Sequence, residues 1–164
     1  IAIENAILDY GYEYLALHQE ININYNAGWN IVGLPLEVEY AHYQTLYPES
    51  IEGTLYSFDG NYDPSTNLIN GEGYWLRFNE EGSTNISGTI INELTINLHE
   101  GWNLITGGSI SLNILDIQDP DGIIISSTVY SFNNGVYTIS ENMEPGKGYW
   151  IRANNSGSII LTSE

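Results

Sequence analysis

Gly146-Lys147-Gly148-Tyr149-Trp150-Ile151-Arg152 is the stretch that decides the fold, because Gly71-Glu72-Gly73-Tyr74-Trp75-Leu76-Arg77 precedes it in nearly the same form. Two more blocks recur upstream in the same order and at about the same spacing: Gly28-Trp29-Asn30 with Gly101-Trp102-Asn103, and Leu55-Tyr56-Ser57-Phe58 with Val129-Tyr130-Ser131-Phe132. A duplicated unit of this length is a supersecondary block that buries its apolar face against its twin. The 164-residue chain therefore predicts two homologous halves.

The spacing of apolar residues predicts that both halves are built from strands. Each half opens with strict alternation of apolar and polar residues, at 21–25 and 94–98, which is typical of a half-buried strand. We expect Gly28 and Gly101 to adopt positive φ and to close a hairpin into the next strand. A second hairpin is expected to turn at Asp59-Gly60-Asn61 and at Asn133-Asn134-Gly135, since Asp-Gly and Asn-Gly are strong hairpin signals.

These elements predict the all-β class, with two pseudo-twofold-related β repeats packed into a sandwich- or barrel-like body. Repeat 1 covers residues 20–92 and repeat 2 covers residues 93–164, as one paired-repeat module. Short helical inserts are expected at 37–47 and 111–117. The sequence leaves open whether residues 1–19 belong to this fold, and residues 5–17 fit a helix or an interrupted strand.

The charge balance restricts the partners. The net charge is −18, from 21 acidic residues against three cations, and these cations are Arg77, Lys147 and Arg152. Such a field repels nucleic acid and anionic membranes, and it favours neutral or weakly charged glycans over polyanions. No stretch is long and apolar enough to predict membrane insertion. The chain has no cysteine, which excludes disulfides and thiolate metal sites.

The Tyr-Trp strands carry the leading candidate ligand-binding residues. Alternation places Trp75 and Arg77 on one face of their strand, and Trp150 and Arg152 on the equivalent face of theirs. An arginine two residues after a tryptophan can lie across the indole as a cation–π pair. The functional interpretation is an aromatic platform with an adjacent donor, which suits stacking on a sugar ring. The structural interpretation is a tryptophan buried between the halves, with arginine closing its edge.

Two further aromatic groups were assigned from their places in the repeats. Tyr62 and Tyr137 follow the hairpin turns, where an exposed tyrosine beside amide side chains is typical of recognition loops, although ordinary loop chemistry fits equally. Trp29 and Trp102 are expected to anchor the core, and the asparagine that follows each is expected to cap a turn.

Catalytic and metal-binding patterns are weak. The three histidines lie at unrelated positions and lack a nucleophile partner, so we expect no catalytic residues and no enzyme activity. A small hydrolase would instead require two carboxylates facing each other in a cleft, at least one with a perturbed pKa. Asp116, Asp119 and Asp121 invite a calcium interpretation, but their spacing does not match an EF-hand loop, so no cofactor is predicted.

The order Gly-Trp-Asn, Tyr-Ser-Phe, Pro-Gly-Lys-Gly-Tyr-Trp-Ile resembles the β repeats found in accessory regions of large secreted or cell-surface bacterial proteins. The second half, with Pro145-Gly146-Lys147, is the closer match. The resemblance implies an accessory module of an extracellular or cell-surface, multi-domain protein. The expected function is non-catalytic carbohydrate binding, with polysaccharide as the partner. The alternative is a structural or adhesive spacer that contacts neighbouring domains of its parent protein.

Overall fold

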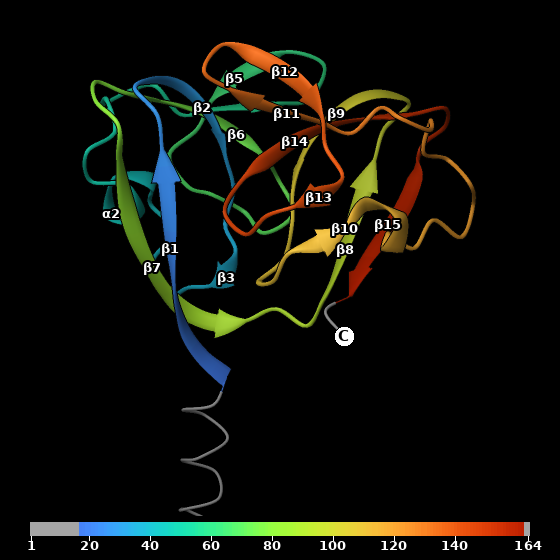
Figure 1. Ribbon diagram of the computed structural model, residues 1–164, viewed down its shortest axis with the longest axis horizontal. Coiled ribbons are helices and arrows are strands. Elements are labelled where there is room, and N and C mark those ends of the chain that lie inside the picture. Colours follow the sequence, from blue (N-terminus) through green and yellow to red (C-terminus); the bar gives the residue numbers. More distant parts are fainter. Residues whose placement is uncertain (1–16, 163–164) are drawn as a thin grey trace, which may run out of the picture.

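Antiparallel strands dominate residues 17–162, the part of the chain that the computed structural model describes (Figure 1). The strands are β1 (His18–Tyr25), β2 (Gly28–Val32), β3 (Leu36–Glu37), β4 (Tyr56–Phe58), β5 (Tyr62–Pro64), β6 (Tyr74–Phe78), β7 (Gly82–Ile90), β8 (Glu93–Leu98), β9 (Gly101–Thr106), β10 (Leu112–Asn113), β11 (Tyr130–Asn133), β12 (Val136–Ile139), β13 (Asn142–Met143), β14 (Gly148–Ala153) and β15 (Gly157–Thr162). Short helices are α2 (Tyr43–Leu46) and the 3-10 helix η1 (Ile114–Asp116). The predicted all-β class is confirmed. The alternatives for residues 5–17 fall, up to residue 16, outside the described residues, whereas His18 and Gln19 of the segment 1–19 belong to β1.

The sheets of the two halves have equivalent strand orders. One four-stranded sheet runs β2-β6-β4-β5, and the other runs β9-β14-β11-β12. The first strand of each half pairs with the last, β1 with β7 and β8 with β15, in continuous antiparallel register. The strand β3 adds to the free side of β7, and β10 pairs separately with β13. Each half therefore builds its own core between a four-stranded sheet and a long strand pair.

The turn after the first strand of each half is a corner, so the predicted hairpin there is wrong. The strands β1 and β2 belong to different sheets, as do β8 and β9. Gly28 and Gly101 do have positive φ, at +85° and +98°, and Asn30 and Asn103 cap the corners as expected. The Asn30 side chain accepts from the Asn26 N–H at 2.9 Å and donates to the Asn26 carbonyl at 2.8 Å, and Asn103 repeats both contacts with His99. A glycine turn after an alternating strand is compatible with either geometry.

The two predicted β-hairpins are confirmed. The strands β4 and β5 pair antiparallel around a turn with Gly60 at φ +76°, and β11 and β12 pair around Asn134 and Gly135. Both of these last residues have positive φ, at +50° and +82°, which a type I′ turn requires. The hairpins lie together at the upper end of the molecule in Figure 1, near the ends of β2 and β9.

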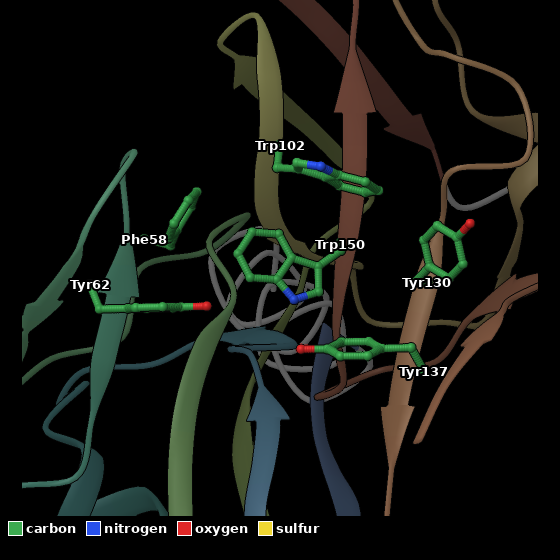
Figure 2. A pocket seen from close by; sticks show the side chains of 6 residues that line it. All are labelled: Phe58, Tyr62, Trp102, Tyr130, Tyr137 and Trp150. Atoms are coloured by element: carbon green, nitrogen blue, oxygen red, sulfur yellow. The ribbon is translucent and has the colours of Figure 1, made fainter. Parts of the chain in front are cut away.

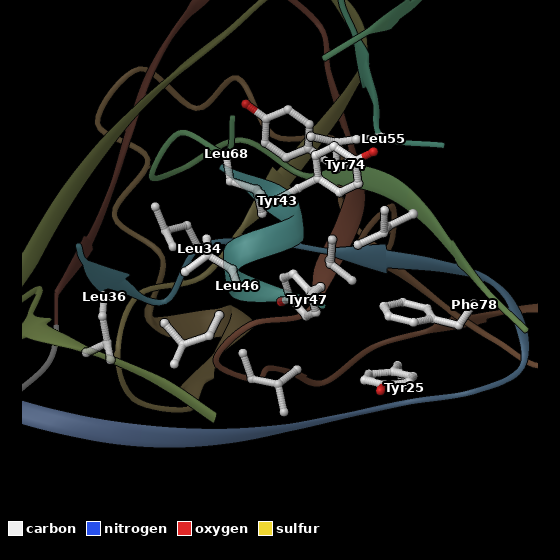
Figure 3. Packing of buried hydrophobic residues seen from close by; sticks show 14 residues of the cluster. Tyr25, Leu34, Leu36, Tyr43, Leu46, Tyr47, Leu55, Leu68, Tyr74 and Phe78 are labelled. Carbon is white, nitrogen blue, oxygen red and sulfur yellow. The ribbon is translucent and has the colours of Figure 1, made fainter. Parts of the chain in front are cut away.

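The predicted helical inserts are present as single short elements that cover each core. Figure 3 shows the side chains of α2 directed into the first core, where Tyr43 and Leu46 lie beside the fully buried Tyr47. Tyr25 and Phe78 stack at the other end of this cluster, with ring centroids 3.7 Å apart. The insert of the second half contains no tyrosine, and it packs against its core through the partly buried Leu112, Ile114 and Ile117.

A third apolar cluster lies between the halves. Its buried members are Ile31, Leu104 and Trp150, and partly buried aromatic rings from both halves pack against it: Phe58, Trp75, Tyr130 and Phe132. Backbone hydrogen bonds cross the same boundary, from the Gly33 N–H to the Gly146 carbonyl and from the Thr106 N–H to the Gly71 carbonyl, both 3.1 Å. The halves therefore share buried side chains and backbone pairing.

The recurring Gly-x-Gly segments allow the halves to approach this closely. A Cβ at Gly148 would overlap the Cγ2 of Ile31, and one at Gly73 would lie 2.8 Å from the Ile105 carbonyl oxygen. Real Cβ atoms do not approach other atoms that closely, so a side chain at either position would force its neighbours to move. The glycines of the Tyr-Trp motif are thus contact points between the halves.

Candidate functional site: two aromatic pockets

Each hairpin places a phenylalanine against the central tryptophan of the other half. The ring of Phe58, from β4, lies edge-to-face on Trp150 with centroids 4.8 Å apart, and Phe132, from β11, contacts Trp75 at the same distance. Aromatic pairs prefer such T-shaped geometry because the positive edge of one ring meets the negative face of the other. The hairpins are therefore held over the opposite half.

Polar contacts at the hairpin turns support the same crossing. The Asn26 side chain donates to the Asn133 Oδ1 at 2.7 Å, which joins the corner of the first half to the hairpin of the second. At the equivalent place in the other half, His99 Nε2 lies 3.6 Å from a carboxylate oxygen of Asp59. Both of these side chains are largely exposed, so the pair contributes little to stability.

A second tryptophan in each half is open to solvent. Trp29 is 40% exposed and Trp102 is 42% exposed, so the prediction that they anchor the core is wrong. Trp29 stands at 89° to Trp75, with centroids 6.3 Å apart, and Trp102 stands at 86° to Trp150, 6.4 Å apart. Neighbouring residues of a strand point to opposite faces, so the buried Asn30 and Asn103 point inward and the indoles of Trp29 and Trp102 point outward.

These rings line two pockets of about 470 Å³ each, within the size range of small-molecule sites. The first is lined by Phe58, Tyr62, Trp102, Tyr130, Tyr137 and Trp150 (Figure 2). The second is lined by Trp29, Tyr56, Tyr62, Trp75, Phe132 and Tyr137. Each pocket takes four residues from one half and two from the other.

Tyr62 and Tyr137 belong to both pockets. They are 54% and 50% exposed, and Figure 2 shows their hydroxyl groups directed toward each other across the first pocket. Burial raises the pKa of Tyr137, a hydrogen bond with Trp150 opposes that rise, and the neighbouring Tyr62 adds to it. The two pockets are therefore adjacent and share two lining residues, and the hydroxyl groups of these tyrosines are polar groups at the shared side.

The pockets bring together four of the six ligand-binding residues predicted from the sequence. Tyr62, Tyr137, Trp75 and Trp150 all line the pockets, although Trp150 is only 8% exposed and so has little surface to offer as a platform. Trp75 and Trp150 also contact the opposite half, as the structural interpretation expected.

The arginines lie beside the pockets rather than over the predicted tryptophans. The Arg77 guanidinium carbon is 5.9 Å from the ring centre of Trp29, and Arg152 has the same distance to Trp102. The sequence paired each arginine with the tryptophan two residues before it, but strand register places Trp29 directly opposite Arg77, and Trp102 opposite Arg152. A cross-strand neighbour on the same face lies closer than a residue two positions along the strand.

The third cation has a structural role. Lys147 Nζ donates to the Asn24 carbonyl in the other half, and burial lowers the pKa of this amine. Its place in the repeat is taken in the first half by Glu72, which accepts a 2.7 Å hydrogen bond from the Tyr74 hydroxyl. Lys147 is thus part of the contact between the halves and lines neither pocket.

Sequence reasoning missed six of the pocket residues: Trp29, Tyr56, Phe58, Trp102, Tyr130 and Phe132. A usable signal was present in the Tyr-Ser-Phe blocks, because residues two apart on a strand share a face. Tyr and Phe in that arrangement, just before a tight turn, predict an aromatic face at the end of a hairpin. The crossing of this hairpin onto the other half has no local signal.

The lining of the two pockets, within residues 17–162, contains aromatic side chains and no carboxylate, histidine or cation. The described residues contain no cluster of three or more histidine or acidic side chains able to hold a metal ion. The carboxylate of Asp119, considered above for calcium, accepts hydrogen bonds from the N–H groups of Ile123 and Ile124 at 2.9 and 2.8 Å. It therefore stabilises a turn.

Comparison of the chain with known protein families, with curated proteins and with solved structures finds no match. Within residues 17–162, no helix has the length and apolar character that crossing a membrane demands. The assignment of function therefore rests on the geometry of the two pockets.

Proposed function

We propose that this chain is a non-catalytic carbohydrate-binding module that holds neutral or weakly charged glycans in the two aromatic pockets. The single observation that carries the proposal is the pair of adjacent, solvent-open pockets walled by tryptophan, tyrosine and phenylalanine. Aromatic faces stack on the apolar C–H faces of pyranose rings, and the tyrosine hydroxyls at the centre can hydrogen-bond to sugar hydroxyls.

Charge supports a neutral ligand. The net charge of −18 opposes polyanionic glycans, and no charged side chain is among the residues that line the two pockets. Arg77 and Arg152 stand beside the exposed Trp29 and Trp102, so a cationic ligand stacking on those rings would meet an existing guanidinium. A neutral sugar avoids both penalties.

A spacer or adhesive module is the second candidate function. The observation that favours it is the burial of Trp150 in the cluster between the halves, which gives this tryptophan a structural task. A spacer, however, gains nothing from Trp29 and Trp102 standing open, since exposed indoles contribute little to folding. The exposed tryptophans are the reason that carbohydrate binding is proposed first.

The module is further proposed to act outside the cell, as part of a larger bacterial protein. The support for this is the resemblance of the Gly-Trp-Asn and Pro-Gly-Lys-Gly-Tyr-Trp blocks to repeats of secreted and cell-surface proteins, together with the absence of cysteine and the acidic composition. Fractionation of the source cells, followed by immunoblotting with an antibody to the module, tests this location.

Retention on insoluble polysaccharides tests the binding function. The wild-type chain is mixed with cellulose, xylan, mannan and chitin, and the bound fraction is measured beside that of Trp29→Ala/Trp102→Ala. Tyr40→Ala is the matched control, because Tyr40 is 67% exposed and lies outside both pockets. We expect retention of the wild type and the control, and its loss in the double variant with an unchanged circular dichroism spectrum. Failure of folded wild type to bind any of these polysaccharides rejects the function.

A further inference from the structure

The two pockets share walls, and this sharing restricts the kind of ligand that can fill them. Building on the proposed carbohydrate function, we propose that one linear chain of β-linked pyranoses with equatorial hydroxyls lies across both pockets at once. The pockets would then be subsites of one groove. Neither the duplication nor the aromatic composition alone requires this arrangement.

Adjacency comes from Tyr62 and Tyr137, which line both pockets. Two separate ligands would compete for the same two phenol groups, whereas consecutive sugars of one chain can share them. Figure 2 shows the two hydroxyls directed toward each other across the first pocket, and in this proposal the linkage between sugars passes beside them. Trp102 lines only the first pocket and Trp29 only the second, so each tryptophan marks the unshared side of its subsite.

The orientation of the rings selects the stereochemistry of the sugar. In the second pocket, Trp75 stands at 89° to Trp29 and at 78° to Phe132, so a sugar meets aromatic surface from more than one direction. The first pocket repeats this, with Trp150 at 86° to Trp102 and Phe58 at 80° to Trp150. A β-glucose unit carries only C–H groups in its axial positions, so both of its faces are apolar. An axial hydroxyl would be pressed against an aromatic wall with few partners for its hydrogen bonds.

The arginines fit the ends of such a groove. Within residues 17–162, no carboxylate oxygen lies within 4.0 Å of the Arg77 or Arg152 guanidinium nitrogens. Each guanidinium instead lies beside the tryptophan on the unshared side of its pocket. It can therefore donate hydrogen bonds to hydroxyl oxygens of a sugar that stacks there. This places polar donors at both ends and phenol hydroxyls in the middle.

Isothermal titration of the full chain with cello-oligosaccharides, from cellobiose to cellohexaose, tests the inference. We expect one cellohexaose per protein, and an association constant about 10²–10⁴ higher than for a sugar that fills one pocket, because the second contact becomes intramolecular. Trp29→Ala and Trp102→Ala should each reduce cellohexaose binding to the level of the short sugar. Tyr40→Ala should leave it unchanged. A β-1,4-mannan oligosaccharide of equal length carries an axial 2-hydroxyl on each unit and should bind at least tenfold more weakly.

The outcomes separate the inference from the function on which it rests. Two oligosaccharides per protein, with affinity independent of chain length and one site surviving in each tryptophan variant, would overturn the spanning chain and leave carbohydrate binding intact. Equal or tighter binding of the mannan oligosaccharide would overturn the equatorial stereochemistry. Retention on mannan but not on cellulose would do the same. If no polysaccharide or oligosaccharide binds at all, the proposed function fails together with the inference.

Discussion

Substitution of Gly148 by alanine gives the sharpest test of how the two halves meet. Local propensity favours the change, since glycine within a strand is less stable than alanine by about 0.5–1 kcal/mol. The structure opposes it, because the new Cβ would overlap the Cγ2 of Ile31 and lie 3.2 Å from the Val32 carbonyl oxygen. Ile31 is 3% exposed, and Val32 forms a β-bridge to Lys147, so neither can withdraw. We expect Gly148→Ala to lower the free energy of unfolding by about 1–3 kcal/mol, as for an overpacked core.

Urea unfolding followed by far-UV circular dichroism measures the change, and Gly108→Ala is the matched control. A Cβ at Gly108 would have its nearest neighbour, the Ile91 carbonyl oxygen, at 3.6 Å, which is ordinary contact. The control should therefore keep its midpoint or gain slightly. Equal stability of the two alanine variants would refute the proposed close contact between the halves.

A double-mutant cycle identifies the contact responsible. Ile31→Ala removes the methyl group that a Cβ at position 148 would strike, and on its own should cost about 2–5 kcal/mol through lost burial and a cavity. The double variant should then be more stable than the sum of the two single costs predicts, by about 1–2 kcal/mol, because the new methyl group enters the cavity. Strict additivity would mean that the cost of Gly148→Ala arises elsewhere.

Three further predictions follow from burial and hydrogen bonding. Acrylamide should quench the fluorescence of the exposed Trp29 and Trp102 and largely spare that of the buried Trp150. The variants Trp150→Phe and Trp102→Phe assign the fluorescence to individual tryptophans. Strong quenching of Trp150 would contradict its burial. Burial raises the pKa of Tyr149 from its ordinary 10.0 to about 12, so the folded state loses stability as the pH rises through that interval. The urea midpoint of Tyr149→Phe should therefore fall less steeply with pH than that of the wild type. An identical pH dependence in the two proteins would show that Tyr149 is not the group responsible. Asn103→Ala should lower the free energy of unfolding in urea by about 1–3 kcal/mol, because it removes the hydrogen bonds that cap the β8–β9 corner. Unchanged stability would show that water replaces these hydrogen bonds.

Local sequence rules predicted the strands well because those rules act over a few residues. Alternation in β6 gave Tyr74, Leu76 and Phe78 a common buried face, and all three are at most 1% exposed. The Asn134-Gly135 pair predicted its hairpin because both positions need positive φ, which few other residues tolerate. These features depend on residues that are neighbours in the chain.

The candidate site was harder to predict because it depends on contacts between distant segments. The sequence predicts Trp29 in the core because it follows a turn that is expected to return the chain there, but the strand turns Asn30 inward, where the asparagine caps the corner. Arg77 was paired along its own strand, although the register of β2 against β6 decides its neighbour. Phe58 reaches Trp150 only because the hairpin crosses to the other half. None of these three arrangements can be read from a few consecutive residues of the sequence, because each depends on segments that are distant in the chain.

The crossing of the hairpins links the duplication directly to the proposed binding site. A single half would present Trp29, Tyr56, Trp75 and Tyr62, but its pocket would lack the Phe132 and Tyr137 walls that the other half supplies. Each half therefore completes the pocket of its twin, and the glycine contacts hold the two halves together. A substitution that separates the halves, such as Gly148→Ala, should then weaken oligosaccharide binding even where the chain remains folded. A variant that loses stability at this contact and binds cellohexaose unchanged would break the link between the fold and the site.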